Sequence, residues 1–149
     1  MKKELLSPAG SFAALKQAIH NGCDAVYLGG KKFGARKFAS NFDEEEMVQA
    51  IRYCHLYGVK IYVTVNTIIY ESEIAEALNY IRFLHQSKVD AVIMQDIGLI
   101  TLVRQQFPNL EIHASTQLHT HNNNQIKQLE ELGIKRVVVA RELSLDEIQ

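Results

Sequence analysis

The stretch DAVYLGGKKFGARKFASNF, residues 24–42, decides how the whole chain is interpreted. Its apolar beginning, residues 24–28, predicts a strand that is buried on both faces, and the glycines at positions 29 and 30 end that strand. The rest has no helical or strand period and interleaves cations with aromatic rings, namely Lys31, Lys32, Arg36, Lys37, Phe33, Phe38 and Phe42. We expect a long loop here, because α/β proteins place functional residues in loops that follow buried strands.

Further strands and helices alternate on both sides of this stretch. Short apolar runs predict strands at residues 4–6, 60–65, 91–94, 111–115 and 136–140, and helical spacing predicts helices at residues 12–20, 47–57, 73–84, 98–107 and 123–132. Capping residues support the helix starts, with Ser11 before the first helix and Asp-x-x-Glu or Ser-x-x-Glu boxes at residues 43–46 and 144–147.

A weak internal echo precedes three of the strands: GCDAV at residues 22–26, KVDAV at residues 88–92 and GIKRV at residues 133–137. Each copy joins the end of a helix to a tight turn and a buried strand. Strands that alternate with helices in this way form a parallel sheet with the helices outside.

Two architectures share this alternation, a doubly wound open sheet and a (β/α) barrel. No GxGxxG follows the first strand, which weakens the case for a dinucleotide-binding sheet. Polar residues recur at the carboxyl ends of successive strands, where a barrel has its mouth: Asn66, Asp96, Gln117, Arg141 and Glu142. We therefore predict an α/β fold, a parallel (β/α) TIM-type barrel that is incomplete, with about six of the eight βα units.

The predicted barrel occupies residues 1–149 as a single domain, whereas a complete barrel typically has about 250 residues. We expect these residues to be the N-terminal part of a longer chain. An open barrel leaves two sheet edges unpaired, and unpaired edges favour association. The sequence therefore predicts self-association of the open barrel.

Composition restricts the environment and the partners of the chain. The net charge of −1 gives no global attraction to nucleic acid or to an anionic membrane, so any basic recognition must be local. No apolar run approaches the roughly 20 residues that a membrane span needs. Cys23 and Cys54 have no CxxC spacing, which predicts reduced thiols packed as small hydrophobic residues in a cytoplasmic protein.

The cationic side chains of the long loop, Lys31, Lys32 and Arg36, allow two interpretations. They capture an anionic or nucleic-acid ligand, with the aromatic rings available for stacking, or the loop is solvated and its phenylalanines pin it to the rim of the barrel. Asp96 also has two interpretations, a general base or ligand group and the cap of the helix that follows, and the sequence favours the cap.

Other candidate residues carry weaker signals. His119 and His121 lie two residues apart, but no third ligand is evident, so we predict no metal site. Arg141 and Glu142 form either a structural ion pair or a pair of substrate ligands. The sequence contains no GxSxG, HExxH or P-loop motif, so no catalytic residue can be assigned.

The combination of SPAG at residues 7–10, VYLGGKKFGAR at 26–36, VTVNT at 63–67 and ARELSL at 140–145 resembles the N-terminal barrel region of the collagenase-like peptidases of peptidase family U32, whose catalytic type is unassigned. The resemblance covers essentially the whole chain. It implies a bacterial-type protein that acts on a protein or peptide substrate. It also implies a barrel mouth lined by Gly29, Gly30, Phe33, Arg36, Asn66, Ser115, Gln117, Arg141 and Glu142.

The resemblance implies a second activity as well. Relatives act as oxygen-independent hydroxylation factors for tRNA, ribosomal RNA or ubiquinone, and they hold an iron–sulfur cluster on cysteines that follow the region matched here. Those cysteines are absent from these 149 residues, so we expect no cofactor in this segment. Three hypotheses remain for the chain: part of a peptidase, part of an RNA or ubiquinone hydroxylation factor, or an inactive fold fragment. Whether the chain is itself an enzyme stays open.

Overall fold

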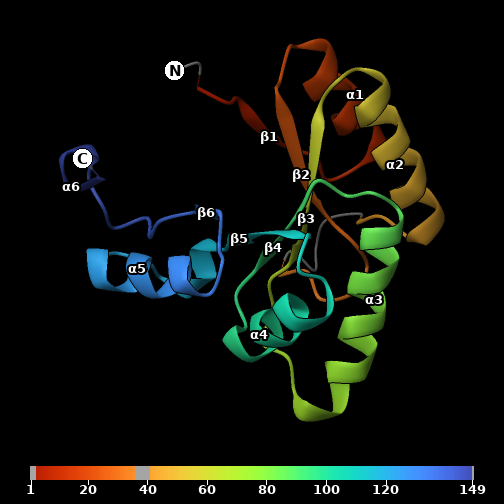
Figure 1. Ribbon diagram of the computed structural model, residues 1–149. Helices are drawn as coiled ribbons and strands as arrows, with labels where there is room; N and C mark the ends of the chain where they lie inside the picture. The colour runs from red at the N-terminus through yellow and green to blue at the C-terminus, as the bar shows by residue number, and fades with distance from the viewer. Residues whose placement is uncertain (1–2, 36–40, 149) are drawn as a thin grey trace.

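The computed structural model describes residues 3–35 and 41–148 (Figure 1). Within them, six parallel strands form one sheet in the order in which they occur in the chain. The strands are β1 (Leu6–Pro8), β2 (Ala25–Gly29), β3 (Lys60–Val65), β4 (Ala91–Met94), β5 (Glu111–Ala114) and β6 (Arg136–Val137). The α-helices are α1 (Phe12–His20), α2 (Glu44–Leu56), α3 (Ile74–Gln86), α4 (Ile97–Gln106), α5 (Asn123–Glu131) and α6 (Leu145–Ile148), and short 3-10 turns lie at η1 (Glu71–Glu73) and η2 (Thr116–Leu118).

This strand order and the helices between the strands confirm the incomplete (β/α) barrel that the sequence predicts. The sheet curls, so it has an outer face covered by helices and an inner face. Ile61, Val63 and Val65 of β3 face outward into the main core, and all three are fully buried. Burial of each such side chain contributes roughly 1.5–3 kcal/mol. Tyr62, which alternates with them, points to a smaller cluster on the inner face with Ala25, Ala91 and Ile93.

The helix starts follow the predicted capping. The hydroxyl of Ser11 accepts a hydrogen bond from the backbone N–H of Ala14 at 3.2 Å. Asp43 and Glu46 form a reciprocal capping box at the start of α2. These bonds satisfy backbone N–H groups that have no partner inside the helix.

Two edge strands differ from the prediction. β1 begins at Leu6 rather than residue 4 and includes Pro8, which lies at the sheet edge where a missing N–H removes no ladder bond. β6 ends at Val137 rather than residue 140. Val138 and Ala140 still donate to the carbonyls of Ala114 and Thr120. In the described sheet β6 has one strand neighbour, β5, and it does not continue as a regular strand.

The sequence echo has a structural reason. In GCDAV, the carboxylate of Asp24 accepts a hydrogen bond from the N–H of Leu5 at 2.8 Å, just before β1. In KVDAV, the carboxylate of Asp90 accepts from the N–H of Ile61 in β3 at the same distance. Each aspartate thus ties the start of the preceding strand to its own strand. The third copy has Lys135 at this position and keeps only the backbone bond that all three copies share, from the Lys135 N–H to the carbonyl of Ile112.

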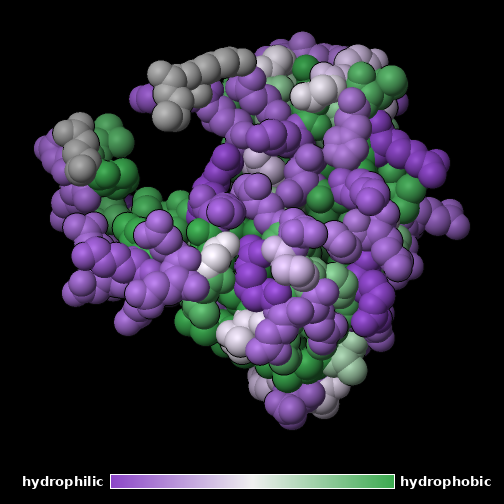
Figure 2. Space-filling view, viewed as in Figure 1, coloured by the Kyte–Doolittle hydropathy of each residue, from purple (hydrophilic) through white to green (hydrophobic). Residues whose placement is uncertain are grey.

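The half-barrel is open between its first and last strands. Figure 1 shows an arm made of α5, β6 and α6 that extends away from the body formed by α1, α2 and α3. In the same view, Figure 2 shows a hollow between this arm and the N-terminal strand, with hydrophobic residues along the arm. Exposed apolar residues of the arm include Val138, Leu145 and Ile148. Among the residues described, no helix combines the length and apolarity that crossing a membrane requires.

Candidate binding site at the barrel mouth

A cavity of about 330 Å³ lies at the carboxyl ends of the strands. It gathers polar groups from three separate connections: Asn66 after β3, Ser115 and Gln117 after β5, and Arg141 after β6. These four residues were predicted from the sequence as mouth residues, and the structure brings them together. Gly29 and Gly34 form part of the wall, so the long loop after β2 also borders the cavity.

The cavity has further polar or aromatic lining residues that the sequence analysis missed: Tyr27, Asn41, Thr64 and Thr116. The alternation of side chains along a strand could have predicted two of them, Tyr27 and Thr64. Gly29 pairs with Thr64 and Tyr27 with Tyr62 across β2 and β3, so these positions share the inner face. Asn41 has a positive φ of 45°, a conformation that asparagine adopts more readily than most residues.

The long loop is closed at its base. The N–H of Lys31 donates to the carbonyl of Phe42 at 3.1 Å, and the N–H of Phe42 donates to the carbonyl of Gly29 at 3.0 Å. The ring of Phe42 is buried in the main core. The base is also crowded at Gly30, where a Cβ atom would lie 2.0 Å from the hydroxyl of Tyr80 in α3.

The loop cations are placed differently from the mouth residues. The ammonium of Lys31 forms an ion pair with Asp43 at 3.2 Å, and that of Lys32 pairs with Glu76 of α3. Glu76 raises the pKa of Lys32. Neither lysine lines the cavity. Arg36, the third predicted cation, lies outside the described residues.

Two predicted carboxylates also lie apart from the cavity lining. Asp96 accepts from the N–H of Leu99 at 2.8 Å and caps α4, which confirms the interpretation that the sequence favoured. Its second oxygen accepts from the N–H of Ile69 at 3.2 Å and so fixes the loop after β3. Glu142 and its neighbour Arg141 are both exposed, and no ion pair between them is found in the described part of the chain.

Asn66 bonds to two sides of the mouth. Its Oδ1 atom accepts from the N–H of Ala35 at 3.0 Å, and its Nδ2 atom donates to the Oγ of Ser115 at 3.2 Å. Its backbone N–H donates to the carbonyl of Phe33 at 2.9 Å. One residue at the end of β3 therefore contacts both the loop after β2 and the connection after β5.

The histidine pair does not form a ligand set. Nδ1 of His121 lies 2.6 Å from the carbonyl oxygen of His119, so this ring is directed at the backbone. Among residues 3–35 and 41–148, no group of three or more His, Cys, Asp or Glu side chains is arranged to hold a metal.

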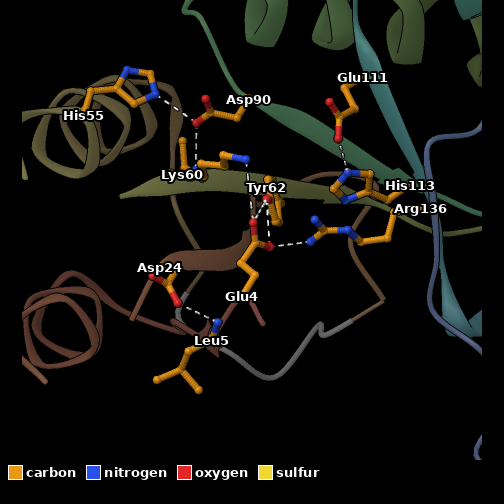
Figure 3. A network of polar contacts seen from close by, with 11 residues as sticks. Glu4, Leu5, Asp24, His55, Lys60, Tyr62, Asp90, Glu111, His113 and Arg136 are labelled. Carbon is orange, nitrogen blue, oxygen red and sulfur yellow. Dashed lines mark hydrogen bonds and ion pairs between the residues drawn. The ribbon is translucent and has the colours of Figure 1, made fainter. Parts of the chain in front are cut away.

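A second polar cluster lies at the opposite, amino end of the strands (Figure 3). Glu4, before β1, forms an ion pair with Arg136 of β6 and accepts from the hydroxyl of Tyr62 at 3.0 Å. The Arg136 guanidinium lies over the Tyr62 ring, 5.4 Å from its centroid. His113 lies beside this ring and bonds Glu111 at 2.7 Å. The cluster spans the inside of the half-barrel from its first strand to its last.

Charge and burial set the pKa values of this cluster. The hydrogen bond from Arg136 holds the pKa of Glu4 below its usual value. Burial raises the pKa of Tyr62 to about 12, and the Glu4 carboxylate that its hydroxyl bonds adds to the shift. Burial lowers the pKa of His113, against the opposing effect of Glu111. Burial therefore disfavours the charged form of His113, whereas the ion pair favours the charged forms of Glu4 and Arg136.

The fold is an incomplete (β/α) barrel with a cavity at the carboxyl ends of its strands. The sequence model of peptidase family U32 matches residues 10–149, and the chain belongs to this family. The prediction made from the sequence motifs is confirmed.

The chain is similar in sequence to proteins named as RNA hydroxylation proteins and to one named as a collagenase. It is 44% identical over 146 residues to a 23S rRNA 5-hydroxycytidine C2501 synthase of Escherichia coli, and 39% identical over 148 residues to tRNA hydroxylation protein P1 of Bacillus subtilis. It is also 33% identical over 147 residues to a collagenase of Porphyromonas gingivalis. The matches cover 98–99% of this chain but only 22%, 35% and 35% of these three relatives.

Solved structures support the fold. The structure of the U32 peptidase Mk0906 matches 93% of this chain and 58% of its own, with a TM-score of 0.75 at 14% sequence identity. The YdjI aldolase of Escherichia coli K12 matches 89% of this chain and 50% of its own, with a TM-score of 0.61 at 15% identity. At these identities the likeness concerns the fold alone.

Proposed function

We propose that this chain is the RNA-binding part of an RNA hydroxylation factor and that the mouth cavity holds one nucleotide of the substrate. The chemistry of the cavity lining carries the proposal. Its polar groups are amides, hydroxyls and one guanidinium, contributed by residues such as Asn66, Ser115, Gln117 and Arg141. Amide and hydroxyl groups donate and accept hydrogen bonds at the edges of a base, and a guanidinium suits a phosphate.

Size and stacking agree with this ligand. A volume of about 330 Å³ lies at the lower end of the range of roughly 300–1,000 Å³ for small-molecule sites, which suits a single nucleotide. The ring of Tyr27 lies in the wall and offers an aromatic surface for a base. The two relatives quoted above as acting on ribosomal RNA and tRNA support an RNA substrate for this chain. An RNA substrate also favours a location in the cytoplasm.

Peptide hydrolysis is the second candidate, favoured by the collagenase of Porphyromonas gingivalis among the relatives. Within the described residues, no carboxylate, imidazole or thiol lines the cavity. Ser115, a hydroxyl-bearing lining residue, is buried, and its Oγ already accepts from Asn66 and from the N–H of Gln117. The lining thus supplies groups for binding, while a general base for hydrolysis would have to come from elsewhere.

The cysteines of this chain do not fit an iron–sulfur cluster. Cys23 and Cys54 are buried, with no disulfide, in the core between the helices and the sheet, away from the mouth. Burial raises the pKa of Cys54 to about 12, which opposes the thiolate form that cluster ligands need. Any cluster that works with this site would be held by cysteines outside these 149 residues, so we derive no step from it.

Fluorescence anisotropy with a labelled eight-nucleotide oligouridylate tests RNA binding. We expect saturable binding that Arg141→Gln weakens about tenfold, with the salt dependence of log K reduced by about 0.7 for one lost phosphate contact. Arg52→Gln, at an exposed position of α2, is the matched control and should leave the affinity unchanged. Absence of binding, or equal effects of the two variants, refutes the proposal. Gelatin cleavage by the pure chain, lost in Arg141→Gln, would support the peptidase instead.

The open edges of the sheet support a further expectation, that the chain associates with itself. β1 and β6 each have one strand neighbour in the described sheet, and unpaired edges template association. Light scattering at rising concentration should show a mass above that of the monomer. A monomer at every concentration contradicts this expectation.

A further inference from the structure

The cavity has two walls that come from distant parts of the sequence. One wall is the loop after β2, represented by Gly34 and Ala35. The other is the connection after β5, represented by Ser115, Thr116 and Gln117. β3 and β4 lie between the strands that precede these walls, so no ladder bond joins them directly.

The first wall adopts a conformation that needs support. Phe33 has a positive φ of 58°, which costs a non-glycine residue of its kind free energy. Its carbonyl accepts bonds from the N–H of Asn66 at 2.9 Å and from the hydroxyl of Thr67 at 3.3 Å. The next contact, from the N–H of Ala35 to Oδ1 of Asn66, fixes the segment where it turns into the cavity.

The second wall begins at a buried hydroxyl. Ser115 is 3% exposed, and its Oγ accepts both from Nδ2 of Asn66 and from the N–H of Gln117 at 3.3 Å. The latter bond starts the 3-10 turn η2, which carries Thr116 and Gln117 into the lining. A shift of the Asn66 amide would therefore move the hydroxyl on which this turn begins.

We propose that Asn66 is a positioning residue that couples the two walls of the cavity and so sets the shape in which the nucleotide is held. The proposal rests on the proposed function for the identity of the ligand. Both ends of one amide group are used: the oxygen holds the loop after β2 and the nitrogen holds the connection after β5. The amide acts through Ala35 and Ser115, and its position determines how far apart the walls stand.

Amide hydrogen exchange, followed by NMR on the chain without RNA, tests the coupling directly. In Asn66→Ala we expect exchange of the Ala35 N–H to become about tenfold faster and that of Gln117 about threefold faster. In Ser115→Ala, Ala35 should stay protected while Gln117 loses protection. Asn79→Ala, an exposed asparagine of α3, is the matched control and should change neither amide. Unchanged Ala35 exchange in Asn66→Ala overturns the inference.

A conservative variant separates positioning from general stability. Asn66→Asp keeps an oxygen for the Ala35 N–H and an oxygen that can accept from the hydroxyl of Ser115. We expect it to restore the protection of Ala35, and it also replaces the alanine variant if that one does not fold. If Asn66→Asp exposes Ala35 as much as alanine does while the rest of the chain stays protected, the inference is wrong.

RNA binding to the same variants is the second test. With the labelled oligouridylate, we expect Asn66→Ala to weaken binding about tenfold, Ser115→Ala about threefold, and the double variant no more than Asn66→Ala alone, because both act through one contact. Costs that multiply to about thirtyfold overturn the coupling. If wild type does not bind RNA but the exchange results hold, the proposed function fails and the coupling of the walls stands.

Discussion

The ion pair between Glu4 and Arg136 joins residues 132 positions apart and connects the first strand region to the last strand (Figure 3). Replacing Glu4 by glutamine removes the charge and keeps a hydrogen-bonding group of the same size. The Tyr62 hydroxyl can still donate to the amide oxygen, so the substitution isolates the contribution of the charge. We expect Glu4→Gln to destabilise the half-barrel at neutral pH.

The contacts of Glu4 set the magnitude of this effect. A hydrogen bond to a charged group contributes about 1.5–3 kcal/mol, against about 0.5–1.5 kcal/mol for a neutral one. The side chain of Arg136 is 37% exposed, so solvent screening reduces its share, and Lys60 at 3.7 Å adds little because it is 58% exposed. We estimate a loss of about 1.5 kcal/mol. For a chain of this size that lowers the Tm by about 5 °C.

Urea unfolding at pH 7, followed by circular dichroism, measures the free energy of unfolding of Glu4→Gln. Glu130→Gln, at an exposed position of α5, is the control and should be within about 0.5 kcal/mol of wild type. The pH dependence gives an independent check. Because Arg136 lowers the pKa of Glu4, its stabilisation is present above the ordinary value of 4.5 and is lost as the pH falls through the lower folded value. If the two variants are equally stable at pH 7, the pair does not stabilise the half-barrel and the reasoning fails.

Three further predictions concern the loop base, the inner face and a helix cap. Gly30→Ala should lower the free energy of unfolding by about 1–3 kcal/mol, because the new Cβ meets the Tyr80 hydroxyl. In urea titrations, adding Tyr80→Phe to this variant should recover part of the loss. If the effects of the two substitutions simply add, the clash is not the cause. Burial lowers the pKa of His113, so the free energy of unfolding should fall as the pH drops below the ordinary value of 6.5. In urea titrations between about pH 7 and pH 5.5, His113→Gln should show a weaker decline. An unchanged decline would exclude His113 as its cause. Asp43→Ala removes the α2 cap and should cost about 1 kcal/mol, whereas Asp146→Ala should cost less, and equal costs would show that the cap is not needed.

The alternation of buried strands and capped helices allowed the fold to be predicted. Apolar runs such as residues 91–94 gave exact strand bounds for β4, and Ser11 and Asp43 gave the helix starts. The strand bounds differ most at β1 and β6, each of which has a single strand neighbour in the described sheet. Edge strands depend on tertiary context more than on their own sequence.

The candidate site was predictable in part. Asn66 follows β3 directly and Gln117 lies in the turn η2 just after β5, so their place at the mouth could be predicted from the chain order. Lys31 and Lys32 could not be placed in this way, because their directions depend on Asp43 and on Glu76, which belong to other elements. The ion pair of Glu4 could not be predicted either, because its partner Arg136 lies 132 positions away in the sequence.

The closed base of the loop after β2 makes the stability of the sheet less dependent on the length of that loop. The backbone bonds between Gly29, Lys31 and Phe42 hold the two ends of this loop together beside the sheet. Doubling the length of a loop between fixed ends costs only about 0.6 kcal/mol of closure entropy. A change in the length of this loop should therefore cost the strands and helices little stability. Selection for a new substrate can act on the loop without rebuilding the protein that carries it.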